Sequence, residues 1–157
     1  MRGLLSGLEK VLGSGLGTGY LPLAPGTWAS LLAAGIYWVL LPQSPYLYIA
    51  IVLTLFFLGV GIATRLEKEW GHDSRKIVID EFVGLFVTMA FLPKSLPLLL
   101  VGFFLFRLCD ITEPFPIAHS ERLPRGWGVM IDDLLAGLYA NIGLHIILFI
   151  PRIARLV

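Results

Sequence analysis

The sequence predicts an all-α membrane protein: a polytopic helix bundle of about five apolar helices, preceded by a short N-terminal amphipathic helix. Of its 157 residues, 57% are hydrophobic and only 15% are charged, whereas about a quarter of the residues in a soluble domain are charged. The apolar residues form long runs, which prolines, glycines and charged segments separate. We therefore expect a single membrane-embedded domain over residues 1–157.

The N-terminal residues predict a helix that lies on the membrane surface. Over residues 1–12, aliphatic side chains fall on one helical face and the charged side chains fall elsewhere. We do not expect a removed signal peptide, because the apolar stretch is too short and lacks a small-residue cleavage site. In residues 13–28, glycines and prolines exclude a regular helix. We expect Thr27 to cap the helix that follows.

Five apolar runs follow, which we predict to be membrane-spanning helices: 28–41, 46–63, 77–92, 98–110 and 134–150. The first run has 14 residues, fewer than the roughly 20 that a perpendicular span needs. It therefore either extends into the preceding loop or lies in a thinned bilayer. Charged loops at 64–76 and 112–131 separate the second run from the third and the fourth from the fifth.

Charge sets the expected orientation. Five up-and-down spans place the N-terminus and both charged loops on one side of the membrane. Eight of the twelve Lys and Arg residues lie in these segments and Arg107 borders them, whereas Lys94, Arg152 and Arg155 lie opposite. The positive-inside rule makes the richer side cytoplasmic, although the two arginines of the C-terminal tail disagree. All eleven Asp and Glu residues lie on this same side.

The topology brings five carboxylates to one depth at the membrane boundary: Asp80, Glu81, Asp110, Asp132 and Asp133. Ionisable groups are costly at this depth and usually serve a function there. Five carboxylates repel one another unless a positive charge lies among them. Mg²⁺ takes oxygen ligands and commonly binds through one or two carboxylates and a substrate phosphate. The acids therefore predict a divalent-metal site at the cytoplasmic face.

Two of these acids also have structural interpretations. Asp132 suits the start of a helix, where the helix dipole favours a carboxylate. Asp110 ends a predicted span, where the dipole disfavours a carboxylate, and it can pair with Arg107 three residues earlier. The glycine-rich loop 13–19 is either a nest of backbone N–H groups for phosphate or a flexible linker.

In the last apolar run, two residues lie on the helical face of Asp133 and predict contact with a neighbouring helix. Gly137 allows a close approach of that helix, and Asn141 suits an interhelical hydrogen bond.

Several other function classes are disfavoured. The net charge of +1 and the absence of a basic stripe argue against nucleic acid as a partner. Cys109 has no arginine six residues later, where Phe115 stands, so the loop of a cysteine phosphatase is missing. Neither a DxDxT motif nor a histidine-phosphatase pattern is present. A hydrolase with these residues would use a metal-activated water as its nucleophile.

Three blocks in order, residues 17–31, 76–84 and 106–141, resemble the phosphatidylglycerophosphatase A family. The resemblance implies Mg²⁺-dependent hydrolysis of a phospholipid substrate, phosphatidylglycerophosphate, to phosphatidylglycerol and inorganic phosphate. It also implies a multi-pass protein of the bacterial inner membrane with its active site on the cytoplasmic side, which agrees with the orientation expected from charge.

The resemblance can be carried over to individual positions. The family's acidic positions fall on the five carboxylates, its basic positions match Arg107 and Arg122, and Thr27 matches the turn before the first span. Our working hypothesis is that Asp80, Glu81, Asp110 and Asp133 supply most of the metal ligands, with Asp132 as general base or outer-shell group, and that Arg107 and Arg122 bind the phosphate. Glu113 stands where the family leads us to expect Lys.

Three alternatives remain open at this stage. A divalent-cation transporter or channel would also place acids within a membrane protein, but along an ion path rather than at one boundary. A related phosphatase would act on another lipid phosphate or on a polyprenyl diphosphate. A non-catalytic scaffold would leave the one-sided acids unexplained. The sequence does not indicate an oligomeric state.

Overall fold

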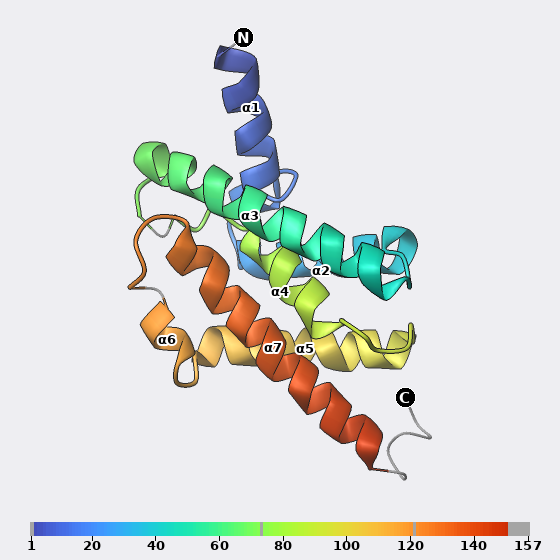
Figure 1. Ribbon diagram of the computed structural model, residues 1–157. Helices are drawn as coiled ribbons and strands as arrows, with labels where there is room; N and C mark the ends of the chain where they lie inside the picture. The colour runs from blue at the N-terminus through green and yellow to red at the C-terminus, as the bar shows by residue number, and fades with distance from the viewer. Residues whose placement is uncertain (1, 73, 121, 151–157) are drawn as a thin grey trace.

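The computed structural model describes residues 2–72, 74–120 and 122–150, and every regular element in these ranges is a helix. The helices, in chain order, are α1 (Arg2–Gly13), the short 3-10 helix η1 (Thr18–Tyr20), α2 (Pro25–Leu40), α3 (Pro45–Trp70), α4 (Asp80–Thr88), α5 (Leu96–Thr112), α6 (Ile117–Ser120) and α7 (Trp127–Phe149) (Figure 1). The predicted all-α class is confirmed.

The prediction of five spans is confirmed only in part. The described residues do contain five apolar helices, but only α3, with 26 residues, and α7, with 23, are long and apolar enough to cross a membrane. Helix α4 has nine residues and is therefore about 14 Å long, less than half of the roughly 30 Å of a bilayer's hydrocarbon core. The apolar residues on either side of α4, 77–79 and 89–92, are not helical.

Helix α4 lies at the centre of the bundle. Seven of its nine residues are buried, and it packs against α2, α3, α5 and, most extensively, α7. Figure 1 shows it enclosed by the longer helices, whereas α1 projects from the bundle. A short helix whose backbone bonds are satisfied can stay at membrane depth when protein surrounds it.

Helices α4 and α7 touch at two glycines. A Cβ added to Gly137 would lie 2.3 Å from the carbonyl oxygen of Gly84, so the backbones are in direct contact there. One turn further along, the Nδ2 group of Asn141 donates to the carbonyl oxygens of Thr88 and Ala90, both at 2.9 Å. The predicted roles of Gly137 and Asn141 in helix contact are confirmed.

Two predicted helix starts are wrong. Helix α2 begins at Pro25, after Ala24 in the left-handed conformation (φ 46°), so Thr27 lies in the first turn and is not the cap. Proline favours this first position because it has no N–H and a fixed φ. Helix α7 begins at Trp127, because the N–H of Gly126 donates to the Thr64 hydroxyl on α3 at 3.1 Å. Asp132 therefore lies in the second turn and does not cap the helix.

The charged segments also differ from their prediction. Residues 64–70 extend α3 rather than forming a loop, and residues 127–131 belong to α7. The extension of α3 is stabilised by ion pairs with α1, between Lys10 and Glu69 and between Glu9 and Arg65. The amphipathic α1 is thus confirmed as a helix, and its placement on a membrane surface stays a prediction.

The glycine-rich loop after α1 is neither a nest of N–H groups for phosphate nor a flexible linker. The backbone N–H groups of residues 14–20 all donate to carbonyl oxygens of residues 10–17, so the loop does not present a nest of free donors. It is also packed rather than free: the Val78 N–H donates to the Gly13 carbonyl at 2.9 Å, and a Cβ on Gly19 would lie 2.3 Å from the Lys76 carbonyl oxygen. The loop holds residues 76–78 in place before α4.

The surface of the long helices is apolar. Phe57 on α3 is 60% exposed, Phe104 on α5 is 67% exposed and Ile146 on α7 is 58% exposed. Large apolar surfaces of this kind mark contact with lipid or with a partner, and together with α3 and α7 they indicate membrane association. The two arginines of the C-terminal tail, Arg152 and Arg155, lie outside the described residues.

Replacing Gly137 by alanine should destabilise the bundle, because a methyl group would meet the Gly84 backbone. Overpacking of this kind costs about 1–3 kcal/mol, so we expect a clear fall in the melting temperature of the protein in detergent. Gly143→Ala on the same helix is the matched control, since its Cβ would lie 3.6 Å from Leu105, an ordinary contact. Equal melting temperatures for the two variants would contradict the tight contact.

Candidate active site

A cavity of about 770 Å³ opens where several helix ends meet. The N-terminal ends of α2 and α4, the C-terminal end of α5 and the second turn of α7 contribute to it, together with the segments before α2 and α4. All five predicted acids line it: Asp80, Glu81, Asp110, Asp132 and Asp133. The structure therefore brings together every acid that the sequence selected.

The glycine contact explains how the acids of α4 and α7 meet. Gly84 follows Glu81 by three residues and Gly137 follows Asp133 by four, so each acid lies about one turn before the contact. The two helices run in the same direction, because Asn141 reaches the end of α4 one turn after the contact. Both acidic pairs are thus held at the same level, beside the C-terminal end of α5.

Glu81 is the centre of a hydrogen-bonded network. The Arg107 Nη1 group donates to both carboxylate oxygens of Glu81 at 2.6 Å, and the Ser30 hydroxyl donates to Oε2 at 2.6 Å. Arg107 also pairs with Asp110 at 2.8 Å, which confirms the predicted ion pair within α5. Because Glu81 is buried, its charge requires these partners.

Three carboxylates are placed to share one cation. Glu81, Asp110 and Asp133 each offer one oxygen, and the three oxygens lie within 4.8 Å of one another. Asp133 is only 3% exposed, and its Oδ2 atom is buried without a hydrogen-bond partner among the described residues. A buried, unpartnered carboxylate oxygen is costly unless a cation binds it. These residues therefore fit a bound metal ion.

The other two acids flank this group. Asp80 Oδ1 accepts the backbone N–H of Glu81 at 3.0 Å, and Asp132 Oδ1 accepts that of Asp133 at 2.9 Å. Both side chains are half-buried at the cavity wall. The two pairs thus have the same arrangement: the first acid bonds to the backbone, and the second belongs to the group of three.

Negative charge dominates the cavity. Its lining includes six acids, the five predicted residues and Glu113, against three bases, Arg75, Lys76 and Arg107. Arg75 and Lys76 are exposed, and the Lys76 ammonium lies over the rings of Tyr20 and Trp70 at 6.0 and 5.8 Å. An anionic phosphate would be repelled by this lining unless a cation neutralised it.

Some contributors were missed by sequence reasoning. Ser30 lies one turn after Gly26. Its isolated hydroxyl in an apolar run is the sequence feature that could have indicated a role in the site. Gly26 is needed for space, because a Cβ there would lie 1.9 Å from Glu81 Oε1. Lys76 lies four residues before Asp80, at the start of the block 76–84 that carries part of the family resemblance.

Two predicted substrate-binding residues are not brought to the cavity lining. Thr27 is half-buried in the first turn of α2, and Arg122 is exposed on the segment between α6 and α7. Neither is among the residues that line the cavity. Their contact with a phosphate stays a prediction.

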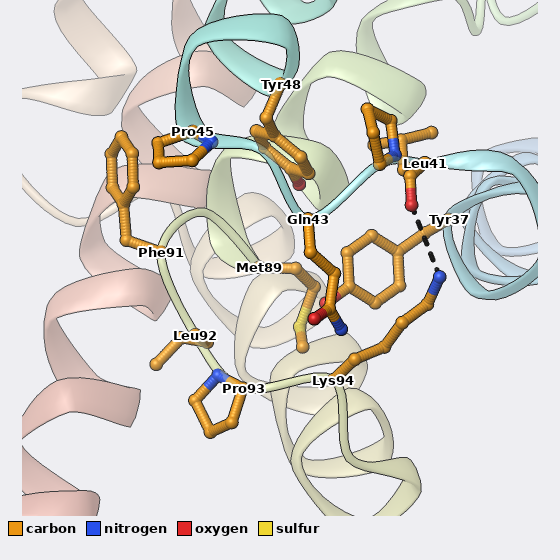
Figure 2. A pocket seen from close by; sticks show the side chains of 11 residues that line it. Tyr37, Leu41, Gln43, Pro45, Tyr48, Met89, Phe91, Leu92, Pro93 and Lys94 are labelled. Carbon is orange, nitrogen blue, oxygen red and sulfur yellow. Dashed lines mark hydrogen bonds between the residues drawn. The ribbon is translucent and has the colours of Figure 1, made fainter.

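A second hollow, of about 310 Å³, lies at the opposite ends of α2 and α4 (Figure 2). Lys94 donates to the Leu41 carbonyl oxygen at 3.3 Å, and its ammonium lies 5.6 Å from the centre of the Tyr37 ring. None of the residues that line this hollow is acidic. The candidate metal ligands are therefore confined to one end of the bundle.

Comparison with known proteins identifies the family of this chain. Residues 11–148 match the family described as phosphatidylglycerophosphatase A. The chain belongs to the phosphatidylglycerophosphatase A family. The resemblance expected from the three sequence blocks is confirmed, and the match covers most of the helices described above.

Individual relatives support the same family. The chain is 42% identical to the phosphatidylglycerophosphatase A of Haemophilus influenzae over 84% of its own length and 83% of the relative's. It is 38% identical to the phosphatidylglycerophosphatase A of Escherichia coli, with 82% and 76% covered. It is also 38% identical to a putative phosphatidylinositol-3-phosphatase of Bacteroides thetaiotaomicron, with 86% and 90% covered. No solved structure matches significantly.

Gly26→Ala should weaken metal binding, because the added methyl group would displace the Glu81 carboxylate. We expect the affinity for Mn²⁺, used as a probe and measured by titration calorimetry in detergent, to fall roughly tenfold, as it does when groups that orient metal ligands are disturbed. Gly35→Ala on the same helix is the control, since no atom lies within 4 Å of its added Cβ. Equal Mn²⁺ affinities for Gly26→Ala and Gly35→Ala would contradict the assignment of Glu81 as a ligand.

Proposed function

We propose that this protein hydrolyses the phosphomonoester of phosphatidylglycerophosphate and releases phosphatidylglycerol and inorganic phosphate, with Mg²⁺ as its metal. The observation that carries the proposal is the group of three carboxylates, Glu81, Asp110 and Asp133, whose oxygens lie within 4.8 Å of one another at a cavity large enough for a headgroup. The family and its relatives' names support the same substrate.

Glu81, Asp110 and Asp133 would hold the metal, and Asp80 would join them from the adjoining wall. An oxygen-only donor set suits Mg²⁺, which keeps several waters and binds substrate phosphate. When bound, the metal would neutralise the charge of the phosphate oxygens and activate a water molecule. Ser30 and Arg107 orient the Glu81 carboxylate, as outer-shell groups commonly orient metal ligands.

The remaining residues would handle the proton and the phosphate. Asp132, at the cavity wall outside the group of three, accepts a proton from the attacking water. The water oxygen would bond to phosphorus, the bond from phosphorus to the glycerol oxygen would break, and Asp132 would return its proton to that oxygen, which leaves as a hydroxyl. Arg107 has a buried Nε group without a hydrogen-bond partner among the described residues, and Lys76 and Arg122 offer further positive charge for the phosphate.

The proposed location is a bacterial cytoplasmic membrane, with the cavity at the cytoplasmic face. Helices α3 and α7 supply the crossing segments, and α2 and α5, with 16 and 17 residues, would complete a multi-pass bundle. The excess of Lys and Arg near the cavity end supports this orientation. A cation channel is disfavoured, because the acids stop at one end and the opposite hollow is lined by none.

A phosphoinositide is a second candidate substrate. The relative named a putative phosphatidylinositol-3-phosphatase matches 86% of this chain, and both lipids present a phosphomonoester. Phosphate release from each lipid, assayed side by side on purified protein, distinguishes the two. Preference for the phosphoinositide would overturn the proposed substrate and leave the phosphatase chemistry in place.

Asp80→Asn and Asp133→Asn should each lower phosphate release from phosphatidylglycerophosphate by roughly 100-fold or more, because loss of a metal ligand exceeds the 10- to 100-fold cost of an outer-shell change. The wild-type activity should require Mg²⁺ and disappear with EDTA. Glu69→Gln, which changes an acid outside the cavity, is the control for expression and membrane insertion. Full activity of both Asp variants would refute the ligand assignment.

A pair of variants distinguishes Lys76 from Arg122, the two candidate phosphate-binding residues besides Arg107. Lys76→Gln should raise KM about five- to tenfold with little change in kcat, as expected when an interaction shared by substrate and transition state is lost. Arg122→Gln tests the sequence-based prediction in the same assay. A raised KM for Arg122→Gln alone would assign the phosphate contact to the segment between α6 and α7 and remove Lys76 from it.

A further inference from the structure

An apolar groove of about 370 Å³ lies between α2 and α5. None of its lining residues carries a charge, and the indole of Trp38 is their one polar side chain. The small residues Ala34 and Gly35 leave room along α2, and the buried Leu99 and Phe103 close the groove on α5. The groove is therefore a surface for hydrocarbon, with no group that would select a polar ligand.

The groove lies next to the acidic cavity along α5. Helix α5 contributes Phe103 to the groove and, four residues later, Arg107 to the cavity. Phe103 and Arg107 are about one turn apart, so they lie on the same face of α5 and roughly 6 Å apart along its axis. A lipid whose phosphate lies in the cavity can therefore place the start of an acyl chain at the groove.

The length and the apolar lining of the groove favour an acyl chain as its occupant. It is lined by residues 31–39 of α2 and 96–104 of α5, which makes it about 12 Å long. An acyl chain is narrow, flexible and apolar and needs no hydrogen-bond partner, so it suits a groove whose lining carries no charge.

We propose that one acyl chain of the phospholipid substrate lies in the groove between α2 and α5 while its phosphate occupies the acidic cavity. The inference rests on the proposed function, because it takes a lipid phosphate as the ligand of the cavity. It adds a site for the apolar part of that ligand, in which Gly35 keeps the groove open. Binding energy from the chain then positions the phosphate at the carboxylates, as remote contacts do in other enzymes.

Filling the groove tests this proposal. No atom lies within 4 Å of a Cβ added to Gly35, and Gly35 lines the groove, so the side chain of Gly35→Leu should extend into the groove. We expect kcat/KM to fall at least tenfold for dioleoyl phosphatidylglycerophosphate and to stay within twofold for the dihexanoyl lipid with the same headgroup. Gly61→Leu on α3, where the added Cβ also meets open space, should leave both values unchanged.

A second variant, together with melting temperatures, distinguishes a blocked groove from a misfolded protein. Leu100→Trp narrows the groove from α5 and should show the same discrimination between the two lipids, and melting temperatures in detergent identify any variant that fails to fold. An unchanged kcat/KM for the dioleoyl lipid in both folded variants, or an equal loss for both lipids, would overturn the proposal. The proposal would also be overturned if the variants lost an oligomer and kept the wild-type lipid selectivity, because the groove would then bind a helix of another protein chain. Failure of the wild-type protein to hydrolyse either lipid would instead overturn the proposed function itself.

Discussion

The contact between α4 and α7 at Gly84 and Gly137 is the constraint on which the rest of the structure depends. A side chain at either position would push the helices apart, since a Cβ on Gly137 would lie 2.3 Å from the Gly84 carbonyl oxygen. The contact sets the axial level of both helices, so their acids face one cavity. Asn141 fixes the same register one turn later by bonding to the end of α4. Close packing at small residues, with polar groups that bond across helices, is how helices associate where no water drives them together.

Burial of α4 then determines the electrostatics of the site. Glu81 lies in the protein interior with its charge compensated by Arg107 and Ser30, while Asp133 keeps an oxygen without a partner among the described residues. Removing one member of such a buried pair leaves an uncompensated charge, which is strongly unfavourable. The bundle thus contains an excess of negative charge at one end, and a divalent cation is the partner that would stabilise it. In our proposal this end would bind the lipid headgroup, and the apolar groove between α2 and α5 would bind an acyl chain.

Much of the candidate site was predictable because acids are conspicuous in an apolar sequence. Asp80, Glu81, Asp110, Asp132 and Asp133 were selected from their place at the ends of apolar runs, and all five line the cavity. Element boundaries were less predictable. Thr27 and Asp132 both resemble helix caps, but Pro25 starts α2 and the docking of Gly126 on α3 starts α7 before Asp132. Packing between helices readily overrides the local preference of a residue such as Thr or Asp for a helix cap.

The sequence by itself determined the all-helical class, the apolar helices and the set of acids, because composition and hydrophobic runs depend only on which residues occur and in what order. Only the tertiary structure decided that α4 is a short enclosed helix rather than a span, since its ends are set by contacts with residues far away in the chain, such as the bond between Val78 and Gly13. It also decided which carboxylates lie close enough to share a cation, and that Ser30, Gly26 and Lys76 belong to the site while Arg122 lies outside the cavity lining. Distances between side chains on different helices follow from how the helices cross, and no local pattern encodes that crossing.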